Sequence, residues 1–327
     1  MTTFNDAALR AIIDLRDAYE ATMDIWRDLD QHEGRMAWKV RGDRSYLYHL
    51  HGDLGNGRSL GPRSPETEAI YAKFRTRKSE IKASLAATTP DLKHAAAVYV
   101  AMGLPVLDSW TAKLVQHLDR AQLLGETVLI IGTNAMPAYQ IEAQQRAGQR
   151  IHATRDLDIA WAPSSAPQEM LLWNALRKFE PEFTINQERP FQARTRARRE
   201  LELLTAPSVI SSASREPFQT LPLPEQEWLL MGERLRQVVT GMDRTPTAIA
   251  VPDPRFFALH KAWLADKPGR DPLKRPKDRS QARLLWSWLH GDMPRYPLDA
   301  AFRAGLPALL VPMAEQLDAS LQPSGQS

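Results

Sequence analysis

Cysteine is absent from the 327-residue sequence, and this absence excludes disulfide bonds, thiolate zinc sites and cysteine nucleophiles. The sequence also lacks a run of apolar residues long enough to cross a bilayer, so we expect no transmembrane helix and no membrane partner. Residues 1–6 show no basic stretch followed by an apolar run. We therefore expect no signal peptide and a cytoplasmic protein.

The composition that remains is that of an ordinary globular protein. Hydrophobic residues make up 43% of the chain and charged residues 25%. A net charge of +3 and a pI of about 9.1 permit a nucleotide or nucleic-acid partner without requiring one. The length is sufficient for two or three structural units with separate cores.

Hydrophobic periodicity predicts an α+β protein of three regions and a tail. Residues 1–119 read as a helical region with a β-hairpin near 36–61. Residues 120–208 read as a compact α/β core with a small mixed sheet, and 209–321 as a helical C-terminal domain. Residues 322–327 are expected to form a disordered tail.

The predicted α/β core begins with a short apolar, β-branched strand at 127–131. A glycine turn and a helix at 135–147 follow, and a second strand is predicted at 156–161. A helix around 169–178 leads to a third strand within 194–204. The order of strand, glycine turn, helix and strand is typical of phosphate-binding α/β units.

The predicted C-terminal region contains helices joined by basic segments. Trp228, Leu229 and Leu235 are expected to share one helix, and residues 248–251 can form a strand. A lysine- and proline-rich loop at 267–277 connects two later helices and is also compatible with a flexible linker.

Asp156 and Asp158 lie two residues apart on the predicted second strand. Successive side chains of a strand alternate, so both carboxylates project from one face, and Leu157 and Ile159 project into the core. Neighbouring carboxylates repel each other unless cations neutralise them. Two Mg²⁺ ions, for which Mn²⁺ can substitute, are therefore the expected cofactors.

A third carboxylate normally completes such a metal site, and the predicted third strand supplies candidates for it. Every second residue of this strand is charged, and these residues are Arg194, Arg196, Arg198, Glu200 and Glu202. The residues between them, with Leu201 and Leu203, form a largely apolar face. Alternation alone does not separate Glu200 from Glu202, because both lie on the same face.

Gly132, Thr133 and Asn134 end the first strand of the core. Glycine lets the backbone approach a phosphate, and the start of the next helix offers unpaired N–H groups. Thr133 and Asn134 add side-chain hydrogen-bonding groups. Each signal alone also occurs at solvated strand edges, but their order between two apolar strands favours a nucleotide-binding site.

Residues 130–135 (IIGTNA) and 153–159 (ATRDLDI) resemble the DNA polymerase beta-like nucleotidyltransferase superfamily. More narrowly, the sequence is similar to a poorly characterised bacterial nucleotidyltransferase-fold family. A more distant similarity is to the AbiEii-type toxins of abortive-infection and toxin–antitoxin systems. The resemblance continues outside the core at Trp38-Lys39, 46–48, 59–63, 256–261 and 277–282.

The resemblance implies roles for the motif residues. Gly132-Thr133 would hold the triphosphate, and Asp156 and Asp158 would bind metal. Glu202, before Leu203, matches the third acidic position better than Glu200 does.

The resemblance also implies that Lys261 and Lys277 bind the nucleotide, because they fall where related enzymes place basic residues facing it. The superfamily more often has serine at the position of Thr133 and aspartate at the third acid. A catalytically weak or inactive descendant is therefore an alternative.

Several other residues have two interpretations each. His260 is more typical of a packed core histidine than of a catalyst. The arginines of 194–199 can bind phosphate or RNA, or form salt bridges with Glu200 and Glu202.

The hairpin near 36–61 also has two interpretations. Trp38, Tyr46 and Tyr48 alternate with Lys39, Arg41 and Arg44, a pattern that can stack and attract nucleic acid. Packing of the aromatic side chains against neighbouring helices is the favoured interpretation.

Two functions are compatible with these observations. The first is a Mg²⁺-dependent nucleotidyltransferase that moves a nucleoside monophosphate from a nucleoside triphosphate (NTP) to RNA or tRNA, a protein or a small molecule, with release of pyrophosphate. The second is a module that binds nucleotide or RNA without transfer, in a toxin or phage-defence system. The nucleotide, the acceptor and the oligomeric state are left open by the sequence.

Overall fold

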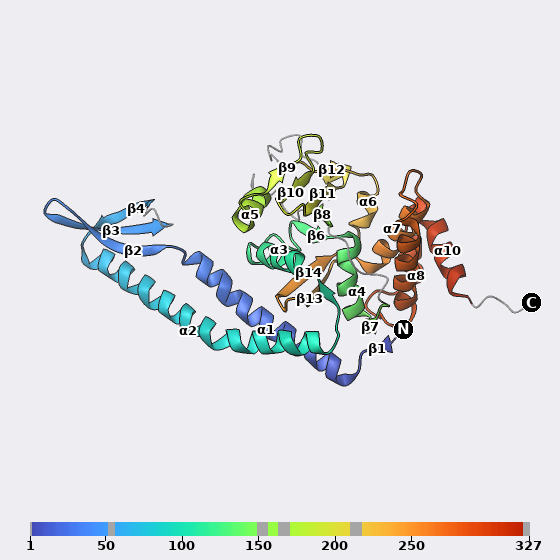
Figure 1. Cartoon of the computed structure of the whole chain (residues 1–327), viewed down its shortest axis with the longest axis horizontal. Helices are drawn as coiled ribbons and strands as arrows, with labels where there is room; N and C mark the ends of the chain where they lie inside the picture. Colours follow the sequence, from blue (N-terminus) through green and yellow to red (C-terminus); the bar gives the residue numbers. More distant parts are fainter. Residues whose placement is uncertain (1, 52–55, 149–155, 163–170, 210–217, 323–327) are drawn as a thin grey trace, which may run out of the picture. The chain divides into compact units, whose positions relative to one another are not determined.

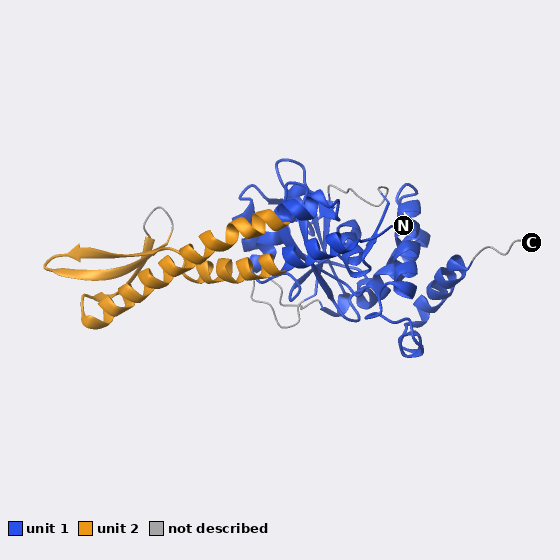
Figure 2. Cartoon of the chain, turned by 90° about the horizontal axis from the view of Figure 1, so that it is seen from below, with its two compact units in different colours: residues 1–16, 96–327 blue, residues 17–95 orange. Residues whose placement is uncertain are grey.

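The computed structural model describes residues 2–51, 56–148, 156–162, 171–209 and 218–322. Residues 153–155 of the family motif and 323–327 of the predicted tail lie outside these ranges. Contacts divide the chain into two compact units (Figure 2), residues 17–95 and the remainder. The predicted boundaries at 119 and 208 stay predictions. As predicted, the protein is a mixed α+β chain.

Two long helices and a small antiparallel sheet build the unit of residues 17–95, here called unit 2. Helix α1 (Asp6–Gln31) and helix α2 (Pro65–Ala101) each continue into unit 1, the rest of the chain. The sheet has the order β2-β3-β4, and its strands β2 and β3 confirm the predicted hairpin. Its strands are β2 (Arg35–Arg41), β3 (Arg44–His51) and β4 (Asn56–Pro62).

A six-stranded mixed sheet forms the centre of unit 1 (Figure 1). Its order is β6-β8-β11-β10-β9, and β12 pairs with β11. Strand β8 pairs antiparallel with β6 and parallel with β11, so it lies between these two apolar strands. The strands are β6 (Val128–Ile130), β8 (Asp156–Trp161), β9 (Thr184–Ile185), β10 (Gln192–Arg194), β11 (Glu200–Thr205) and β12 (Leu221–Pro222).

The third strand predicted within 194–204 is present as β11 but begins only at Glu200, so the charged alternation predicted from Arg194 onward does not belong to one strand. The segment is a hairpin of β10 and β11. In its turn, the backbone N–H of Thr195 donates to the Arg199 carbonyl, and the N–H of Arg198 donates to the Thr195 carbonyl. Arg198 adopts a left-handed backbone conformation with φ of 57°. Of the five charged residues that alternation places on one strand face, only Glu200 and Glu202 therefore lie on the same strand.

The helix predicted at 135–147 is shorter in the structure. A 3₁₀ turn, η1 (Gly132–Ala135), leads into α4 (Met136–Glu142), and strand β7 (Gln145–Arg146) follows. Leu235 does not share a helix with Trp228 and Leu229, because they lie in α6 (Gln226–Leu229) and Leu235 begins a strand.

A second sheet, of order β14-β13-β5, contacts the central sheet through β14 and β6. Strand β14 includes the strand predicted at 248–251. The sheet consists of β5 (Val106–Leu107), β13 (Leu235–Gly241) and β14 (Pro246–Val251). Helix α3 (Ser109–Arg120) lies in the sequence between β5 and β6, and helix α5 (Leu171–Phe179) lies between β8 and β9.

Helices α7 (Pro254–Asp266) and α8 (Arg275–Gly291) pack against each other and confirm the predicted C-terminal helix pair. No helix among the described residues is long and apolar enough to cross a membrane. The remaining elements are β1 (Thr2–Thr3), η3 (Pro207–Val209), α9 (Ala300–Ala304), η4 (Ala308–Leu310) and α10 (Val311–Leu321).

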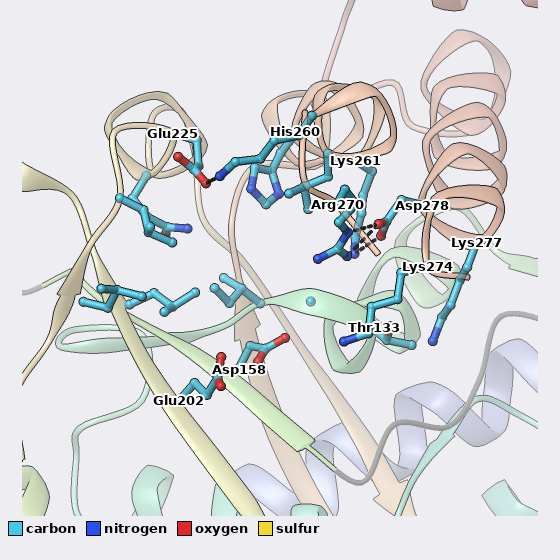
Figure 3. Close-up of a pocket in the computed structure, with 18 of the residues that line it drawn as sticks. Thr133, Asp158, Glu202, Glu225, His260, Lys261, Arg270, Lys274, Lys277 and Asp278 are labelled. Carbon is cyan, nitrogen blue, oxygen red and sulfur yellow. Dashed lines mark hydrogen bonds and ion pairs between the residues drawn. The ribbon is translucent and has the colours of Figure 1, made fainter. Parts of the chain in front are cut away.

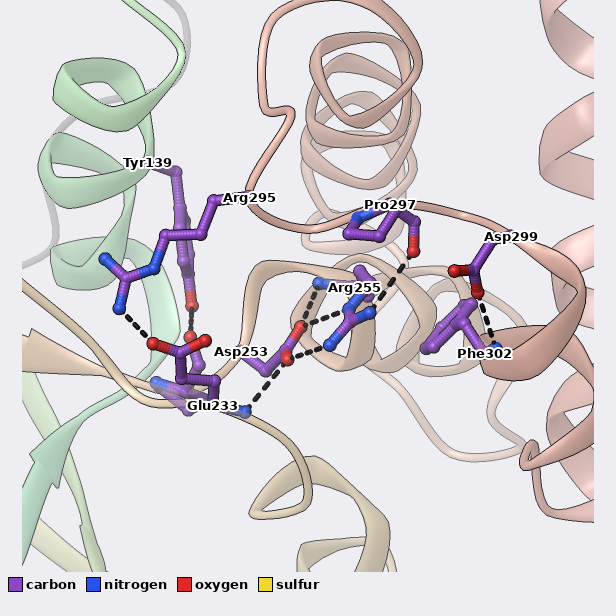
Figure 4. Close-up of polar contacts among 9 residues, drawn as sticks. Tyr139, Glu233, Asp253, Arg255, Arg295, Pro297, Asp299 and Phe302 are labelled. Carbon is purple, nitrogen blue, oxygen red and sulfur yellow. Dashed lines mark hydrogen bonds and ion pairs between the residues drawn. The ribbon is translucent and has the colours of Figure 1, made fainter.

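The start of α7 is fixed by the fully buried carboxylate of Asp253 (Figure 4). Asp253 accepts the backbone N–H of Arg255 at 2.9 Å and that of Glu233 at 3.0 Å. Its two oxygens also accept hydrogen bonds from the Arg255 guanidinium at 3.0 and 2.7 Å. This charge-assisted cap orients a helix that carries three residues of the candidate site, His260, Lys261 and Leu264.

Candidate functional site

The strand register brings the predicted acids together. On the parallel pair β8–β11, Asp158 lies opposite Glu202, and Asp156 lies opposite Glu200. The apolar residues between them, Leu157 among them, are fully buried on the other face, as alternation predicts. Two acids that are separated by 44 positions in the chain thus become neighbours on one face of the sheet.

Gly132 lies on the other side of Asp158. The backbone N–H of Ile131 donates to the Asp158 carbonyl at 3.0 Å, which extends the β6–β8 pairing by one residue. Gly132 then turns away with φ of 66°, and a Cβ built on it would lie 2.5 Å from Asp158 Oδ2. Only glycine accepts both the left-handed conformation and the approach of this carboxylate.

A pocket of about 410 Å³ opens above this part of the sheet (Figure 3). Thr133, Asp158 and Glu202 lie at one side of it. Helices α7 and α8 and the loop that joins them supply basic side chains on the facing side, with Lys261 and Lys277 among them. The pocket is therefore acidic at the sheet and basic at the helices.

Burial raises the pKa of Asp158 above its ordinary value, Lys261 opposes the rise, and the Asp156 carboxylate adds to it. Burial also raises the pKa of Glu202, and the Asp158 carboxylate adds to this rise. The Asp158 charge therefore acts on Glu202. A divalent cation between them would relieve the repulsion.

Glu202 and Glu200 have different surroundings. Glu202 lines the pocket beside Asp158. Glu200 forms an ion pair with Arg194 at 2.8 Å. The amide of Gln192 donates to both glutamates at 3.1 Å and holds the two side chains in place.

Asp156 and Asn134 lie at the margin of the site. Asp156 is exposed and is not among the residues that line the pocket. The amide of Asn134 donates to the Asp156 backbone carbonyl at 3.1 Å, so this side chain ties the turn after β6 to the start of β8.

Lys261 is buried and bonded to protein. Its ammonium donates to Asp278 Oδ1 at 3.0 Å. Arg270 donates to the other oxygen of the same buried carboxylate at 2.8 and 2.6 Å (Figure 3). Burial lowers the pKa of Lys261, and the Asp278 carboxylate opposes that change.

Sequence reasoning missed the functional character of the loop at 267–277, which it treated as compatible with a linker. The loop lines the pocket with Lys267, Arg270 and Lys274, next to the predicted Lys277. Burial lowers the pKa of Lys277, and the charges of Lys261 and Lys274 lower it further. The available signal was five basic residues against one acid in this eleven-residue segment.

The end of the pocket near α6 is lined by leucine side chains and by the Glu225–Lys267 ion pair, and it contains two buried polar atoms without a hydrogen-bond partner among the described residues. These atoms are Gln226 Oε1 and His260 Nδ1. Leu221, Leu223 and Leu264 line the same end. His260 is packed edge-on against Trp228, as its core interpretation predicts, yet it also lines the pocket.

The acidic side offers carboxylate oxygens as metal ligands, but too few to complete the coordination of a metal ion. Among the described residues, no group of three His, Cys, Asp or Glu side chains is arranged to hold a metal ion. Mg²⁺ is usually bound by one or two carboxylates together with substrate phosphates and water. Asp158 and Glu202 therefore fit a metal that arrives with a phosphorylated ligand.

Comparisons with known proteins gave one family. A family model described as nucleotidyltransferase matches residues 109–306. Neither curated proteins nor solved structures gave a match. The matched segment contains every residue of the pocket and leaves out unit 2.

Proposed function

The chain belongs to the nucleotidyltransferase family, and we propose that Asp158 and Glu202 form the metal-binding pair at which it transfers a nucleoside monophosphate from an NTP. The observation that carries the proposal is the register that sets Asp158 between Glu202 and Gly132. Asp156, next to this pair on the same face, would be a third carboxylate at the site.

Mg²⁺ held by these carboxylates and by the triphosphate would supply positive charge at the reacting phosphate and favour ionisation of the acceptor hydroxyl. The chain itself would orient the reactants. Gly132 allows the triphosphate to approach the backbone beside Asp158, and Thr133 offers a hydroxyl to it.

The basic side of the pocket would bind the β- and γ-phosphates. Lys274 and Lys277 line it, and the guanidinium of Arg270 is oriented by its bonds to Asp278. Lys261 supports this arrangement through the same carboxylate. Positive groups at this side would stabilise the charge that develops on pyrophosphate as it leaves.

The leucine-lined end of the pocket near α6 would hold the nucleobase. Gln226 and His260 line this end, and a change of rotamer would let Gln226 Oε1 and His260 Nδ1, which are buried without a partner among the described residues, reach the edge of a base. Burial lowers the pKa of His260 well below its ordinary value, so its ring is neutral and offers one donor and one acceptor. Gln226→Leu is expected to weaken discrimination among the four NTPs.

The proposed transfer exchanges one bond at the α-phosphorus of the NTP for another. A hydroxyl oxygen of the acceptor attacks the α-phosphorus, the bond from that phosphorus to the bridging oxygen breaks, and pyrophosphate leaves. RNA, a protein or a small molecule can provide the hydroxyl. The polymerase beta-like resemblance and the distant similarity to AbiEii-type toxins are compatible with each of these acceptors.

The test is transfer of label from each α-³²P-labelled NTP, with Mg²⁺ and a cell extract, by the wild-type chain and by Asp158→Asn. We expect label in a macromolecule or metabolite and release of pyrophosphate only with the wild type. Labelled material is then treated with ribonuclease or protease to identify the acceptor. NTP binding without transfer above the variant would instead identify a nucleotide-binding module.

A further inference from the structure

The sheet of unit 2 has one face packed against α2. Trp38 lies edge-on to Tyr71 of α2, with ring centroids 5.9 Å apart. His49 makes the same kind of contact with Phe74 at 5.4 Å. Leu47, which pairs with Trp38 across the strands, is fully buried. This inner face confirms the packing interpretation of Trp38.

The opposite face has a different character. Tyr46 and Tyr48 flank Leu47 along β3, so their side chains project from the other side of the sheet. Lys39 pairs with Tyr46, and Arg41 pairs with Arg44, so these cations share that side. Residues 37, 39 and 41 of β2 and 44, 46 and 48 of β3, which define this outer face, include no carboxylate.

The cations of the outer face are exposed and available. Lys39, Arg41 and Arg44 form no ion pair with any residue that the structure describes. The ammonium of Lys39 lies 5.1 Å from the centre of the Tyr48 ring, and the Arg41 guanidinium lies 5.5 Å from it. Both tyrosine rings are partly exposed. Positive charge and aromatic rings therefore occur together on one open surface.

We propose that this outer face binds single-stranded RNA, with Lys39, Arg41 and Arg44 contacting phosphates and Tyr46 and Tyr48 stacking on bases. Charge alone would suit any anionic surface. Aromatic rings interleaved with cations at strand spacing favour unpaired bases, whose rings stack on side chains without a sequence requirement. A role for this RNA as acceptor rests on the proposed function, whereas its binding does not.

Binding is measured by fluorescence anisotropy of a labelled 20-nucleotide oligouridylate with the full-length chain. The variant Lys39→Ala/Arg41→Ala/Arg44→Ala is expected to raise Kd about tenfold or more at moderate salt. The slope of log Kd against log salt should fall by about 2, because each phosphate contact on a single strand contributes about 0.7.

A matched control variant makes the same change in net charge elsewhere. Lys93→Ala/Arg189→Ala/Arg283→Ala removes three exposed cations that lie outside the outer face. It is expected to change Kd less than twofold. Equal weakening by both triple variants would overturn the inference, because it would show that net charge alone governs binding.

Stacking is tested separately at Tyr48. Tyr48→Ala should raise Kd about tenfold, and Tyr48→Phe should change it little, because phenylalanine keeps the ring. Circular dichroism of each variant confirms that the sheet is folded. An unchanged Kd with Tyr48→Ala overturns the inference, and so does binding to phosphatidylserine vesicles without binding to RNA.

The same assay separates this inference from the proposed function. Asp158→Asn should abolish transfer and leave Kd for RNA within about twofold of the wild-type value. Loss of transfer with retained, Tyr48-dependent RNA binding supports the inference whatever the reaction is. Transfer to an acceptor without RNA binding supports the proposed function and contradicts the inference.

Discussion

The carboxylate of Asp158 lies directly against the backbone of Gly132, where a Cβ would come within 2.5 Å of Oδ2. The contact follows from the β6–β8 pairing, which continues through the hydrogen bond from Ile131 to Asp158. It couples the turn proposed to hold phosphate to the carboxylate proposed to hold metal. The predictions below concern this contact and its neighbours.

Gly132→Ala is expected to lower both stability and transfer. An alanine at φ of 66° is strained, and its methyl group displaces the Asp158 carboxylate. The strain should reduce the free energy of unfolding by about 1–3 kcal/mol. Urea denaturation measures this loss, and the transfer assay measures activity. Unchanged transfer by a folded Gly132→Ala variant would show that this contact is not part of the site.

Glu202→Gln and Glu200→Gln are matched variants on one strand face. Glu202 lines the pocket, so its loss is expected to reduce the transfer rate about a thousandfold, because a metal ion supplies several kcal/mol of transition-state stabilisation. Glu200 is paired with Arg194, so its substitution should reduce the rate less than about tenfold. The reverse order of effects would show that Glu200, rather than Glu202, binds the metal with Asp158.

Asp158→Asn is expected to stabilise the metal-free protein at neutral pH. The pKa of Asp158 in the folded state lies above its ordinary value of 3.8, because burial disfavours the charged form. Below pH 3.8 the carboxyl is protonated in both states and has no such cost. The cost grows as pH rises from 3.8 to the raised pKa and is complete above it.

The difference between the two proteins should therefore change with pH. In EDTA, Asp158→Asn should be more stable than the wild type at pH 7.5, because the asparagine carries no charge that burial disfavours. The advantage should shrink toward pH 4.5. Mg²⁺ with NTP should raise the Tm of the wild type only. A wild type more stable than the variant at pH 7.5 would contradict this account.

Asp278→Ala and Lys261→Met should differ in their effects. Asp278→Ala leaves Lys261 and Arg270 without their shared carboxylate, which should cost about 3–5 kcal/mol of unfolding free energy. Lys261→Met leaves Asp278 bonded to Arg270 and should cost less. Denaturation measures both. A larger cost for Lys261→Met would show that Lys261, rather than Asp278, is the centre of this cluster.

Local sequence patterns predicted which faces the acids occupy but not which residues meet. The apolar neighbours Leu157 and Leu201 set the orientation of Asp158 and Glu202, because alternation operates within a strand. The register between β8 and β11 is a long-range property, and alternation cannot supply it. It is the register that places Glu202, rather than Glu200, opposite Asp158.

Two other features were not predictable for physical reasons. The turn before β11 contains neither glycine nor proline, and it is instead stabilised by Thr195, whose hydroxyl accepts the Arg199 N–H at 3.2 Å. The basic loop after α7 reaches the pocket through tertiary contacts, in which Arg270 is held by Asp278 and Lys267 by Glu225. The basic composition of the loop is visible in the sequence, but neither its contact with the pocket nor the Thr195 turn has a local signature.

The most direct test of the proposed site is a crystal structure with Mn²⁺ and an NTP analogue that cannot be cleaved between its α- and β-phosphates. Anomalous scattering then locates the metal. We predict a peak between the carboxylates of Asp158 and Glu202, with the triphosphate against Gly132 and Thr133 and its terminal phosphates toward Lys274 and Lys277. A metal and triphosphate bound elsewhere on the chain would contradict the account.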